Sequence, residues 1–395
     1  MKIVIVTTRV PYPPHKGDKL KIFNIVKYLS KNNSVKVLCL TRGKSEARLP
    51  EGIRALGAEI ETVKHSFLKS VVGAATGFFT SRPIQVSLYR SRKLGKRLAE
   101  IIRTESPDVV YFHFIRGAQY IEYAGIGSQL NVLDFTDAVS LYLSRFADKA
   151  RNPFTRIAVG NERDRIARYE FIAEKFGAAF ICSELDRDYL KGRGVRADFH
   201  LLPNGVDTES FKESDEKADP YRVIFTGNMP YFPNEDAILH FVKDIWPMVV
   251  EKVPKATLYI VGRKPTRKIR SLASEKIFVT GFVEDIAAEY RKSAVAVAPT
   301  RFGAGTLNKV IEAIVLGVPV VATSIGVRGL PHEAQKFVRV ADDDSQFARE
   351  VAGLLGARNG EARYSAESLA ETRRILSWES ILGDFEAYLR SRRTS

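Results

Sequence analysis

Cysteines, long apolar runs and acidic residues are all scarce in this chain, and each shortage bears on the class of protein. The 395 residues include two cysteines, Cys39 and Cys182, each inside an apolar run. A disulfide scaffold does not fit so few thiols, and we expect buried thiols in a reducing cytoplasm. Residues 1–6 lack the length and the cleavage site of a signal peptide, so we expect them to form the first strand.

Long apolar segments are missing as well. No window offers the ~20 uninterrupted apolar residues that a membrane-spanning helix requires, which argues against an integral membrane protein. The sequence has no internal repeat and no low-complexity tract, so repeat architectures do not fit it. Sets of zinc ligands, aromatic ribonucleoprotein motifs and heptad runs are also absent, and a nucleic-acid partner is therefore not expected.

The shortage of acidic residues leaves the chain with a net charge of +15. Such a charge favours an acidic partner, and nucleotide phosphates and anionic lipids both qualify. Residues 64–103 concentrate it, since their nine basic residues are opposed by Glu100 alone and are mixed with apolar residues. Two interpretations are open. The segment contacts an anionic bilayer at the inner face of the plasma membrane, or it is a solvated basic helix whose apolar residues pack inward.

The remaining sequence alternates strand-like apolar runs with helix-like segments, as in a doubly wound parallel sheet. Seven such runs precede residue 203 and six follow residue 220, with a polar linker between the two series. A chain of this length exceeds the size of one typical core, so we expect two α/β domains. The long charged segment 151–176 predicts a helix in the first domain.

One stretch of the second domain has the layout of an anion-binding site. Residues 295–299 predict a strand, 303–306 a glycine-bearing turn, 307–316 a helix, and 318–322 the next strand. The positive end of that helix would then face the carboxyl edge of a parallel sheet, where phosphates bind. Lys309 and Glu312 project from a similar face of the helix, so a cation and a carboxylate would sit beside the same ligand.

Residues 305–319, Gly-Thr-Leu-Asn-Lys-Val-Ile-Glu-Ala-Ile-Val-Leu-Gly-Val-Pro, resemble the donor-nucleotide motif of family 4 glycosyltransferases. Further matches follow in the family's order: Pro-Tyr-Pro-Pro-His-Lys-Gly-Asp at 11–18, Pro-Asn-Gly-Val-Asp at 203–207, Phe-Thr-Gly-Asn-Met-Pro-Tyr-Phe-Pro-Asn at 225–234, Tyr-Ile-Val-Gly-Arg at 259–263, and Val-Thr-Gly-Phe-Val at 279–283. The resemblance implies a retaining transferase of the GT-B fold, with two facing Rossmann-like domains and a cleft between them. The implied domains are residues 1–203, joined by a crossover helix at 377–395, and residues 204–376.

The resemblance implies that the second domain binds a nucleoside diphosphate sugar. Glu312 would accept hydrogen bonds from the ribose, and Lys309 and Arg301 would neutralise the leaving diphosphate. The other implied donor-binding residues are Gly227, Asn228, Gly262, Arg263, Val283, Gly305, Thr306 and Leu307. Arg263 is equally compatible with a solvated position among neighbouring basic residues, and the region of Val283 would contact the base through its backbone.

In the first domain, the resemblance implies an acceptor site in the loop that contains His15, Gly17 and Asp18. His113 ends an apolar strand and matches the family's sugar-contacting histidine, although a structural hydrogen bond would also explain it. Asp134 and Asp137 lie at the end of the strand at residues 131–135. They orient an acceptor hydroxyl or cap the following helix, and we favour the cap.

The sequence departs from the family pattern at Ala304, where an acidic residue usually lies against the donor sugar. A catalytically degenerate subunit that binds nucleotide sugar, or a nucleotide-sugar epimerase of the same fold, are therefore alternatives to an active transferase. The Asp-x-Asp patterns at 186–188 and 342–344 are expected to stabilise helix starts, so no metal and no cofactor are expected. The preferred acceptor is a glycan, free or lipid-linked, of a cell-surface polysaccharide.

Overall fold

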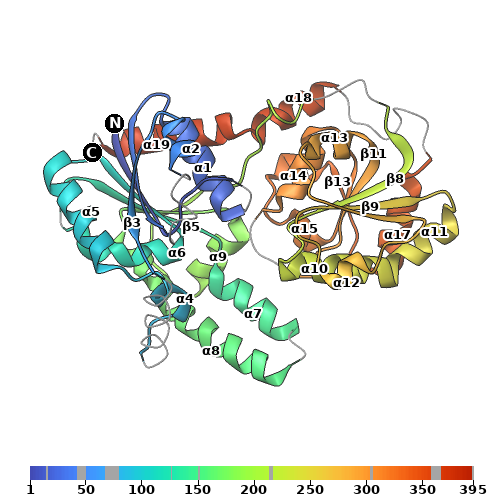
Figure 1. Ribbon diagram of the computed structural model, residues 1–395, viewed down its shortest axis with the longest axis horizontal. Coiled ribbons are helices and arrows are strands. Elements are labelled where there is room, and N and C mark those ends of the chain that lie inside the picture. The colour runs from blue at the N-terminus through green and yellow to red at the C-terminus, as the bar shows by residue number, and fades with distance from the viewer. Residues whose placement is uncertain are drawn as a thin grey trace. The chain divides into compact units, whose positions relative to one another are not determined.

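The computed structural model describes residues 1–14, 17–41, 50–66, 80–125, 127–149, 152–212, 217–302, 306–356 and 366–393. The chain divides into two compact units (Figure 1). Unit 1 comprises Met1–Pro203 and Ile381–Ser395, and unit 2 comprises Asn204–Ser380. The chain thus leaves unit 1 where the sequence motif at 203–207 begins, and it returns to unit 1 at Ile381.

Unit 1 is built on a seven-stranded parallel sheet in the order β3-β2-β1-β4-β5-β6-β7. Its central strands β1 and β4 are buried along almost their whole length, as expected when helices cover both faces of a parallel sheet. The strands are β1 Lys2–Thr7, β2 Ser34–Thr41, β3 Glu59–Lys64, β4 Val109–His113, β5 Leu130–Thr136, β6 Ala178–Ile181 and β7 Phe199–Leu201.

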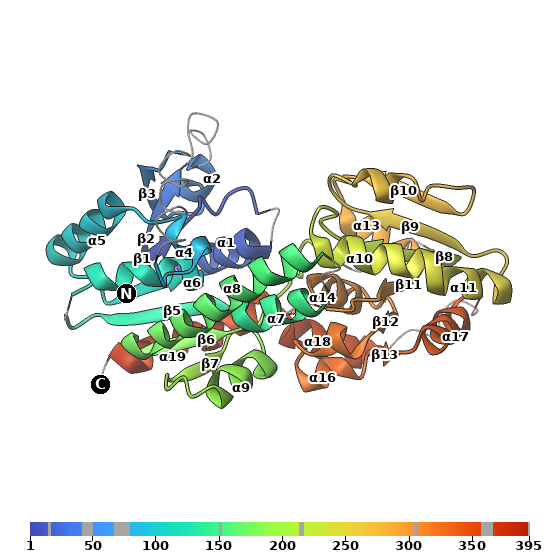
Figure 2. The ribbon, with the colours of Figure 1, turned by 90° about the horizontal axis from the view of Figure 1, so that it is seen from below.

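The helices of unit 1 include an antiparallel pair, α7 and α8, which lie side by side and project away from the sheet of this unit (Figures 1 and 2). The predicted helix at 151–176 is α8 followed by a 3-10 segment, η3. The elements are α1 Gly17–Leu29, α2 Glu51–Arg54, α4 Ile84–Ser87, α5 Arg92–Glu105, α6 Phe114–Gly117, η2 Ala118–Tyr123, α7 Val139–Lys149, α8 Pro153–Tyr169, η3 Glu170–Lys175, α9 Glu184–Gly192 and α19 Trp378–Arg393.

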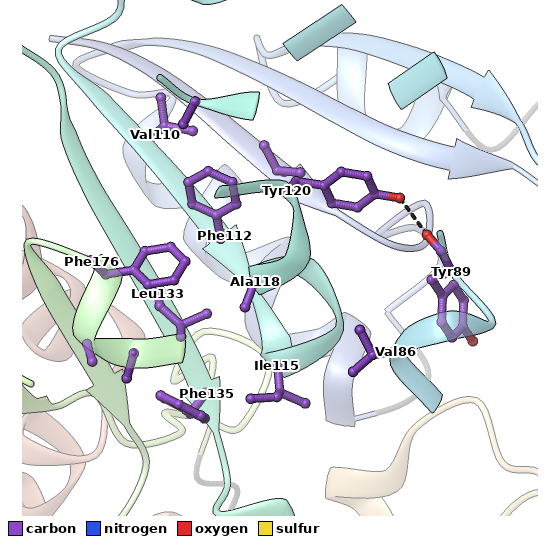
Figure 3. Packing of buried hydrophobic residues seen from close by; sticks show 14 of the residues in the cluster. Val86, Tyr89, Val110, Phe112, Ile115, Ala118, Tyr120, Leu133, Phe135 and Phe176 are labelled. Atoms are coloured by element: carbon purple, nitrogen blue, oxygen red, sulfur yellow. Dashed lines mark hydrogen bonds between the residues drawn. The ribbon is translucent and has the colours of Figure 1, made fainter. Parts of the chain in front are cut away.

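The core of unit 1 is a cluster of apolar and aromatic side chains between the sheet and its helices (Figure 3). Phe112 packs edge-on against Phe176, with ring centroids 5.3 Å apart. The buried hydroxyl of Tyr120 donates to the carbonyl oxygen of Tyr89. From α19, Phe385 packs edge-on against Phe180 at 4.9 Å, so the returning chain completes this unit.

The basic segment 64–103 is described in part, because residues 67–79 lie outside the described ranges. Within it, α5 buries Leu94, Leu98 and Ile101 in the core and keeps its basic residues on the outer side. Arg97 donates from Nη2 to Glu61 at 2.9 Å. In α5 the apolar side chains therefore pack inward, as in the second interpretation of this segment. None of the described helices is both long and apolar enough to cross a bilayer.

Unit 2 is built on a six-stranded parallel sheet in the order β10-β9-β8-β11-β12-β13. The strand order reverses between β8 and β11, and ligands of open α/β sheets bind outside the carboxyl ends at such a switch point. The strands are β8 Asp219–Thr226, β9 Thr257–Val261, β10 Ile277–Gly281, β11 Ser293–Ala298, β12 Val320–Ala322 and β13 Val338–Val340.

Helices cover both faces of this second sheet (Figure 2). One long helix is interrupted by a π turn, η4, between α10 and α11. The elements are α10 Phe232–His240, η4 Phe241–Ile245, α11 Trp246–Lys252, α12 Arg267–Arg270, α13 Ile286–Arg291, α14 Asn308–Val315, α15 Ser324–Val327, α16 His332–Gln335, α17 Asp344–Leu354 and α18 Ala366–Ile375.

Candidate functional site

The start of α14 lies at the carboxyl edge of the unit 2 sheet, beside the switch point. Thr306 is buried and its hydroxyl donates to the carbonyl oxygen of Gly329 at 2.9 Å, which fixes the chain before the helix. Among the described residues, no acceptor is found for the amides of Thr306, Leu307 and Asn308. Gly305 lies outside the described residues. The helix end therefore offers amide groups and a positive dipole to an anion.

Lys309 lies in the first turn of α14 and extends along the edge of the sheet. Its Nζ donates to Oδ1 of Asn234 at 2.8 Å and stands 4.1 Å from the centroid of the Phe225 ring. The ammonium has thus lost most of its water, and this burial lowers the pKa of Lys309 to about 7. An anion that replaces the missing water would hold the proton on this side chain.

Glu312 lies one turn further along α14 and is held by Tyr290 from α13. The Tyr290 hydroxyl is 3.2 Å from Oε2 of Glu312, 3.1 Å from the carbonyl oxygen of Lys309, and 2.6 Å from the hydroxyl of Thr226. Burial raises the pKa of Glu312 to about 7. This network fixes one oxygen of the carboxyl group, and Oε1, which has no hydrogen-bond partner among the described residues, can accept from a ligand hydroxyl.

Two glycines allow the ends of β8 and β9 to come together. A Cβ on Gly262 would lie 1.8 Å from the carbonyl oxygen of Gly227, and a Cβ on Gly227 would lie 2.8 Å from Nδ2 of Asn234. The amide of Gly262 donates to Gly281 at 2.9 Å, which ties in the end of β10. Gly262 requires glycine because of its close approach to backbone, whereas a side chain at Gly227 would displace the amide of Asn234, the hydrogen-bond partner of Lys309.

Three other predicted donor-binding residues lie along the same edge. The carbonyl oxygen of Asn228 accepts from Nδ2 of Asn234 at 3.1 Å, and the carbonyl oxygen of Arg263 accepts from the amide of Met229 at 3.3 Å. The Arg263 guanidinium lies 5.5 Å from the ring centroid of Phe282, which is 59% exposed. Val283 follows and is half-buried against the core.

Arg301, the second predicted diphosphate contact, is engaged with a carboxylate. Its Nε lies 2.9 Å from Oδ2 of Asp236, and Nη2 contacts the other oxygen of that side chain. This two-point pairing neutralises the guanidinium. A diphosphate would have to compete with Asp236 for Arg301, whereas the hydrogen-bond partner of the Lys309 ammonium is the neutral amide of Asn234.

In unit 1, His113 ends β4 at the carboxyl edge of the sheet. Its Nδ1 lies 3.7 Å from Oδ2 of Asp134, and its ring stacks on Tyr111 at a centroid distance of 6.5 Å. The next residue, Phe114, has φ of 68°, and Thr136 at the end of β5 has φ of 64°. Left-handed backbone at such residues is costly and clusters at functional sites. The ends of β4 and β5 therefore carry the clearest backbone sign of a functional site along the carboxyl edge of the unit 1 sheet.

Asp134 forms a fully buried ion pair with Lys21 of α1, 3.0 Å from Nζ to Oδ1. Nζ also donates to the carbonyl oxygen of Leu202 at 2.9 Å and lies 3.4 Å from Sγ of Cys182. The Lys21 ammonium holds the pKa of Asp134 well below its usual range in spite of burial. Asp134 therefore anchors α1 to the sheet and does not cap the helix that follows.

Asp137 lies at the beginning of the connection to α7. Burial and the neighbouring carboxylate of Asp186 raise the pKa of Asp137 to about 7. The start of α7 is capped from other elements, since the amide of Ala138 donates to Asp186 at 3.2 Å and that of Ser140 to Glu170 at 3.0 Å. The choice between an acceptor contact and a cap therefore stays a prediction for Asp137.

The predicted acceptor loop is described in part. Gly17 is the first residue of α1, and the space where a Cβ would stand is open. His15 and the side chain of Asp18 lie outside the described residues. Of the Asp-x-Asp patterns, Asp343 accepts from the amide of Gln346 as the cap of α17, and Asp186 lies in the first turn of α9, which Ser183 caps. The expected helix-start roles are confirmed.

Sequence reasoning did not single out Asn234, Tyr290 or Lys21. Asn234 is the last residue of the motif at 225–234, which was quoted for the resemblance. Its position in the same motif as Gly227 was the signal that could have identified it as a site residue. Tyr290 lies in a short helix before β11, with no local pattern that marks it. Lys21 is one of several lysines in α1, and nothing in the sequence connects it with Asp134, 113 residues away.

Comparison with known proteins supports the assignment of unit 2. Residues 220–357 match the family described as glycosyl transferases group 1. This match confirms the predicted resemblance over the greater part of unit 2. An uncharacterized 44.6 kDa protein in the cps region of Klebsiella pneumoniae is 22% identical over 371 residues, which are 89% of this chain and 90% of that protein.

Solved structures similar to this chain share its whole architecture. Anabaena Alr3699/HepE in complex with UDP-glucose matches with a TM-score of 0.68 and 14% identity, over 99% of this chain and 100% of its own. Sucrose-phosphate synthase from Thermosynechococcus elongatus matches with a TM-score of 0.69 and 13% identity, over 98% of both chains. With the two parallel sheets, these likenesses confirm the predicted GT-B fold.

Proposed function

We propose that the chain is a retaining glycosyltransferase that moves a sugar from a nucleoside diphosphate sugar to a hydroxyl of a glycan or lipid-linked glycan. One observation carries the proposal. The start of α14 combines amides without an acceptor among the described residues, the Lys309 ammonium hydrogen-bonded to a neutral amide, and the fixed carboxyl group of Glu312. A diphosphate and a ribose next to each other need these three groups.

In the reaction, the bond between the anomeric carbon and the leaving phosphate oxygen breaks while the acceptor oxygen bonds to the same face of that carbon. The acceptor proton passes to the leaving phosphate. Lys309 and the amides before α14 stabilise the charge that develops there, as preorganised donors in a dry site do. Because these groups supply positive potential, the proposed reaction requires no metal and no separate nucleophile.

The donor, the acceptor and the place of action are the finer parts of the proposal. UDP-sugars are the first donors to test, because UDP-glucose is bound in the similar Anabaena structure. A lipid-linked acceptor would bring the enzyme to a membrane surface in the cytoplasm, where the net charge of +15 favours anionic lipids. The cps region that encodes the Klebsiella relative supports a role in polysaccharide synthesis.

A thermal-shift panel of nucleoside diphosphate sugars tests the proposal. A ligand that binds only the folded state raises the melting temperature by mass action, and we expect a rise with at least one donor. We then expect that donor, incubated with acceptor extract, to release its nucleoside diphosphate. No shift with any donor would contradict the proposal. Binding without release would favour the degenerate subunit, and a changed sugar without acceptor would favour the epimerase.

We expect affinity for UDP-glucose to fall as the pH rises through 7. Above this pH, Lys309, whose pKa is lowered to about 7, loses its positive charge, and Glu312, whose pKa is raised to about 7, gains a negative one. Both changes make the site less attractive to a diphosphate that does not itself titrate in this range. Calorimetry should show a loss of up to about tenfold per pH unit for the lysine proton.

Two variants serve as controls for this pH dependence. Lys309→Met should weaken the binding of UDP-glucose and remove the part of the pH dependence that comes from the lysine proton. Glu312→Gln should keep that part. A wild-type affinity that does not change between mildly acidic and mildly basic pH would contradict the assignment of these two groups to the diphosphate site.

A further inference from the structure

The tip of the hairpin formed by α7 and α8, by which we mean residues 152–158, presents two large apolar side chains to solvent. Phe154 is 81% exposed and Ile157 is 63% exposed, the highest values for large hydrophobic residues in the described part of the chain. They are three residues apart in the first turns of α8, so both project from the same side of the helix. Figure 1 shows this hairpin as a pair of helices that leaves the sheet of unit 1.

This end of α8 is fixed in place and does not contribute to the core. The side chain of Asn152 accepts from the amides of Phe154 and Thr155 at 2.9 and 3.4 Å, and Pro153 occupies the first helical turn. Residues 152–158 are all exposed, and the first buried residue of the helix is Ile166. Phe154 and Ile157 are therefore held outward by a capped helix at a position where they add nothing to folding.

The sequence around the tip is basic. Arg145, Lys149, Arg151 and Arg156 are opposed by Asp148 alone between residues 145 and 157. Arg156 lies beside the apolar pair in the same turns of α8 and is itself exposed. Exposed aromatic and aliphatic side chains with an arginine next to them, in a basic stretch of sequence, suit the interface of an anionic bilayer, where the apolar groups insert and the cations contact the headgroups.

We propose that the tip of the α7–α8 hairpin inserts Phe154 and Ile157 into the surface of an anionic membrane and so holds the enzyme at its acceptor. The inference rests on the proposed function, since it names the surface through which a lipid-linked acceptor is approached. A protein partner fits less well, because a stable protein interface buries roughly 800 Å² on each side, and two side chains on a narrow tip supply far less apolar area.

The hairpin also fits a membrane better than α5 does. The apolar residues of α5 are in the core of unit 1, so this helix offers a bilayer nothing beyond charge. Binding through α5 would be purely electrostatic and fully sensitive to salt. Binding through the hairpin has an apolar component as well, which salt does not remove.

Flotation with vesicles tests the proposal without any donor or acceptor. The wild-type chain should bind vesicles of phosphatidylcholine and phosphatidylglycerol and should bind phosphatidylcholine alone much more weakly. The double variant Phe154→Ser, Ile157→Ser should bind the anionic vesicles at least about tenfold more weakly. Serine does not supply the favourable free energy that each apolar side chain gains on transfer from water into the bilayer. Val340→Ser, which removes a 42% exposed side chain from unit 2, should bind as the wild type does.

Charge variants separate the two surfaces. Arg156→Ala should weaken binding about fivefold, the share of one basic residue near the headgroups. Arg92→Glu with Lys93→Glu on α5 should have a smaller effect than the double variant of the tip. The proposal is overturned if the α5 variant abolishes binding while the tip variant binds normally, or if the wild type does not bind anionic vesicles at all.

A spectroscopic readout places the tip directly. In Phe154→Trp, the indole emission should shift to the blue with anionic vesicles and should be quenched by brominated lipid. An unchanged spectrum on bound protein would overturn the proposal, as would sedimentation showing that the wild type self-associates and the double variant does not. Donor-induced thermal shifts should be the same in wild type and double variant, so failure here would leave the donor site untouched.

Discussion

Lys309→Met is expected to lower kcat by about 100-fold or more with the donor found by thermal shift, because the variant removes a preorganised cation from the leaving diphosphate. The methionine keeps the approximate length of the aliphatic stem, and the variant loses both the hydrogen bond to Asn234 and the contact of the ammonium with the Phe225 ring. We expect the fold to persist, since an ammonium whose pKa is depressed by burial does not stabilise the protein.

Three measurements complete this prediction. Steady-state kinetics gives kcat and KM, calorimetry gives the affinity for UDP, and thermal denaturation reports folding. Lys292→Met is the matched control, because Lys292 is exposed and pairs with Glu289 at the far end of α13. Wild-type turnover in Lys309→Met, with Lys292→Met also active, would remove Lys309 from the reaction.

Lys21→Met should destabilise unit 1 by about 3–5 kcal/mol, the usual result of removing one partner of a buried ion pair. Lys21 and Asp134 are both inaccessible to solvent, so the buried carboxylate would lose the ammonium that pairs with it. The variant also removes a donor from the carbonyl oxygen of Leu202. Urea denaturation should show the loss as a lower midpoint with an unchanged slope.

The double variant Lys21→Met, Asp134→Leu is the control for this effect. With both charges gone, neither partner of the pair is left as an unpaired buried ion, and much of the stability should return, less the contacts that Tyr111 and the amide of Thr136 make with Asp134. If Lys21→Met alone unfolds at the wild-type midpoint, the pair does not hold α1 to the sheet as we infer.

The architecture could be predicted from sequence because it depends on local patterns. Parallel strands buried on both faces appear as short apolar runs, and the glycine turn before Lys309 marks a strand-to-helix connection. The partners of the charged groups could not be predicted, because they come from distant elements. Arg301 is held by Asp236, 65 residues away, and Lys309 by Asn234, 75 residues away.

The same limit applies to individual elements. The segment 151–176 has the composition of one charged helix, yet the last residues form a 3-10 segment in which Glu170 turns inward to Ser140 and Arg193. Asp134 was expected at a helix start because it precedes one in sequence. Its buried ion pair depends on where α1 packs, and no local rule gives that position.

The contact between Gly227 and Gly262 limits how this enzyme could be redirected to another substrate by laboratory evolution. A methyl group on Gly262 would collide with the backbone of Gly227, and one on Gly227 would displace the side chain of Asn234 that holds Lys309. Productive libraries should therefore leave both glycines and vary the exposed residues nearby. Arg263 and Phe282 are the natural choices, since changes there alter the side chains beside the site without forcing the two strand ends apart.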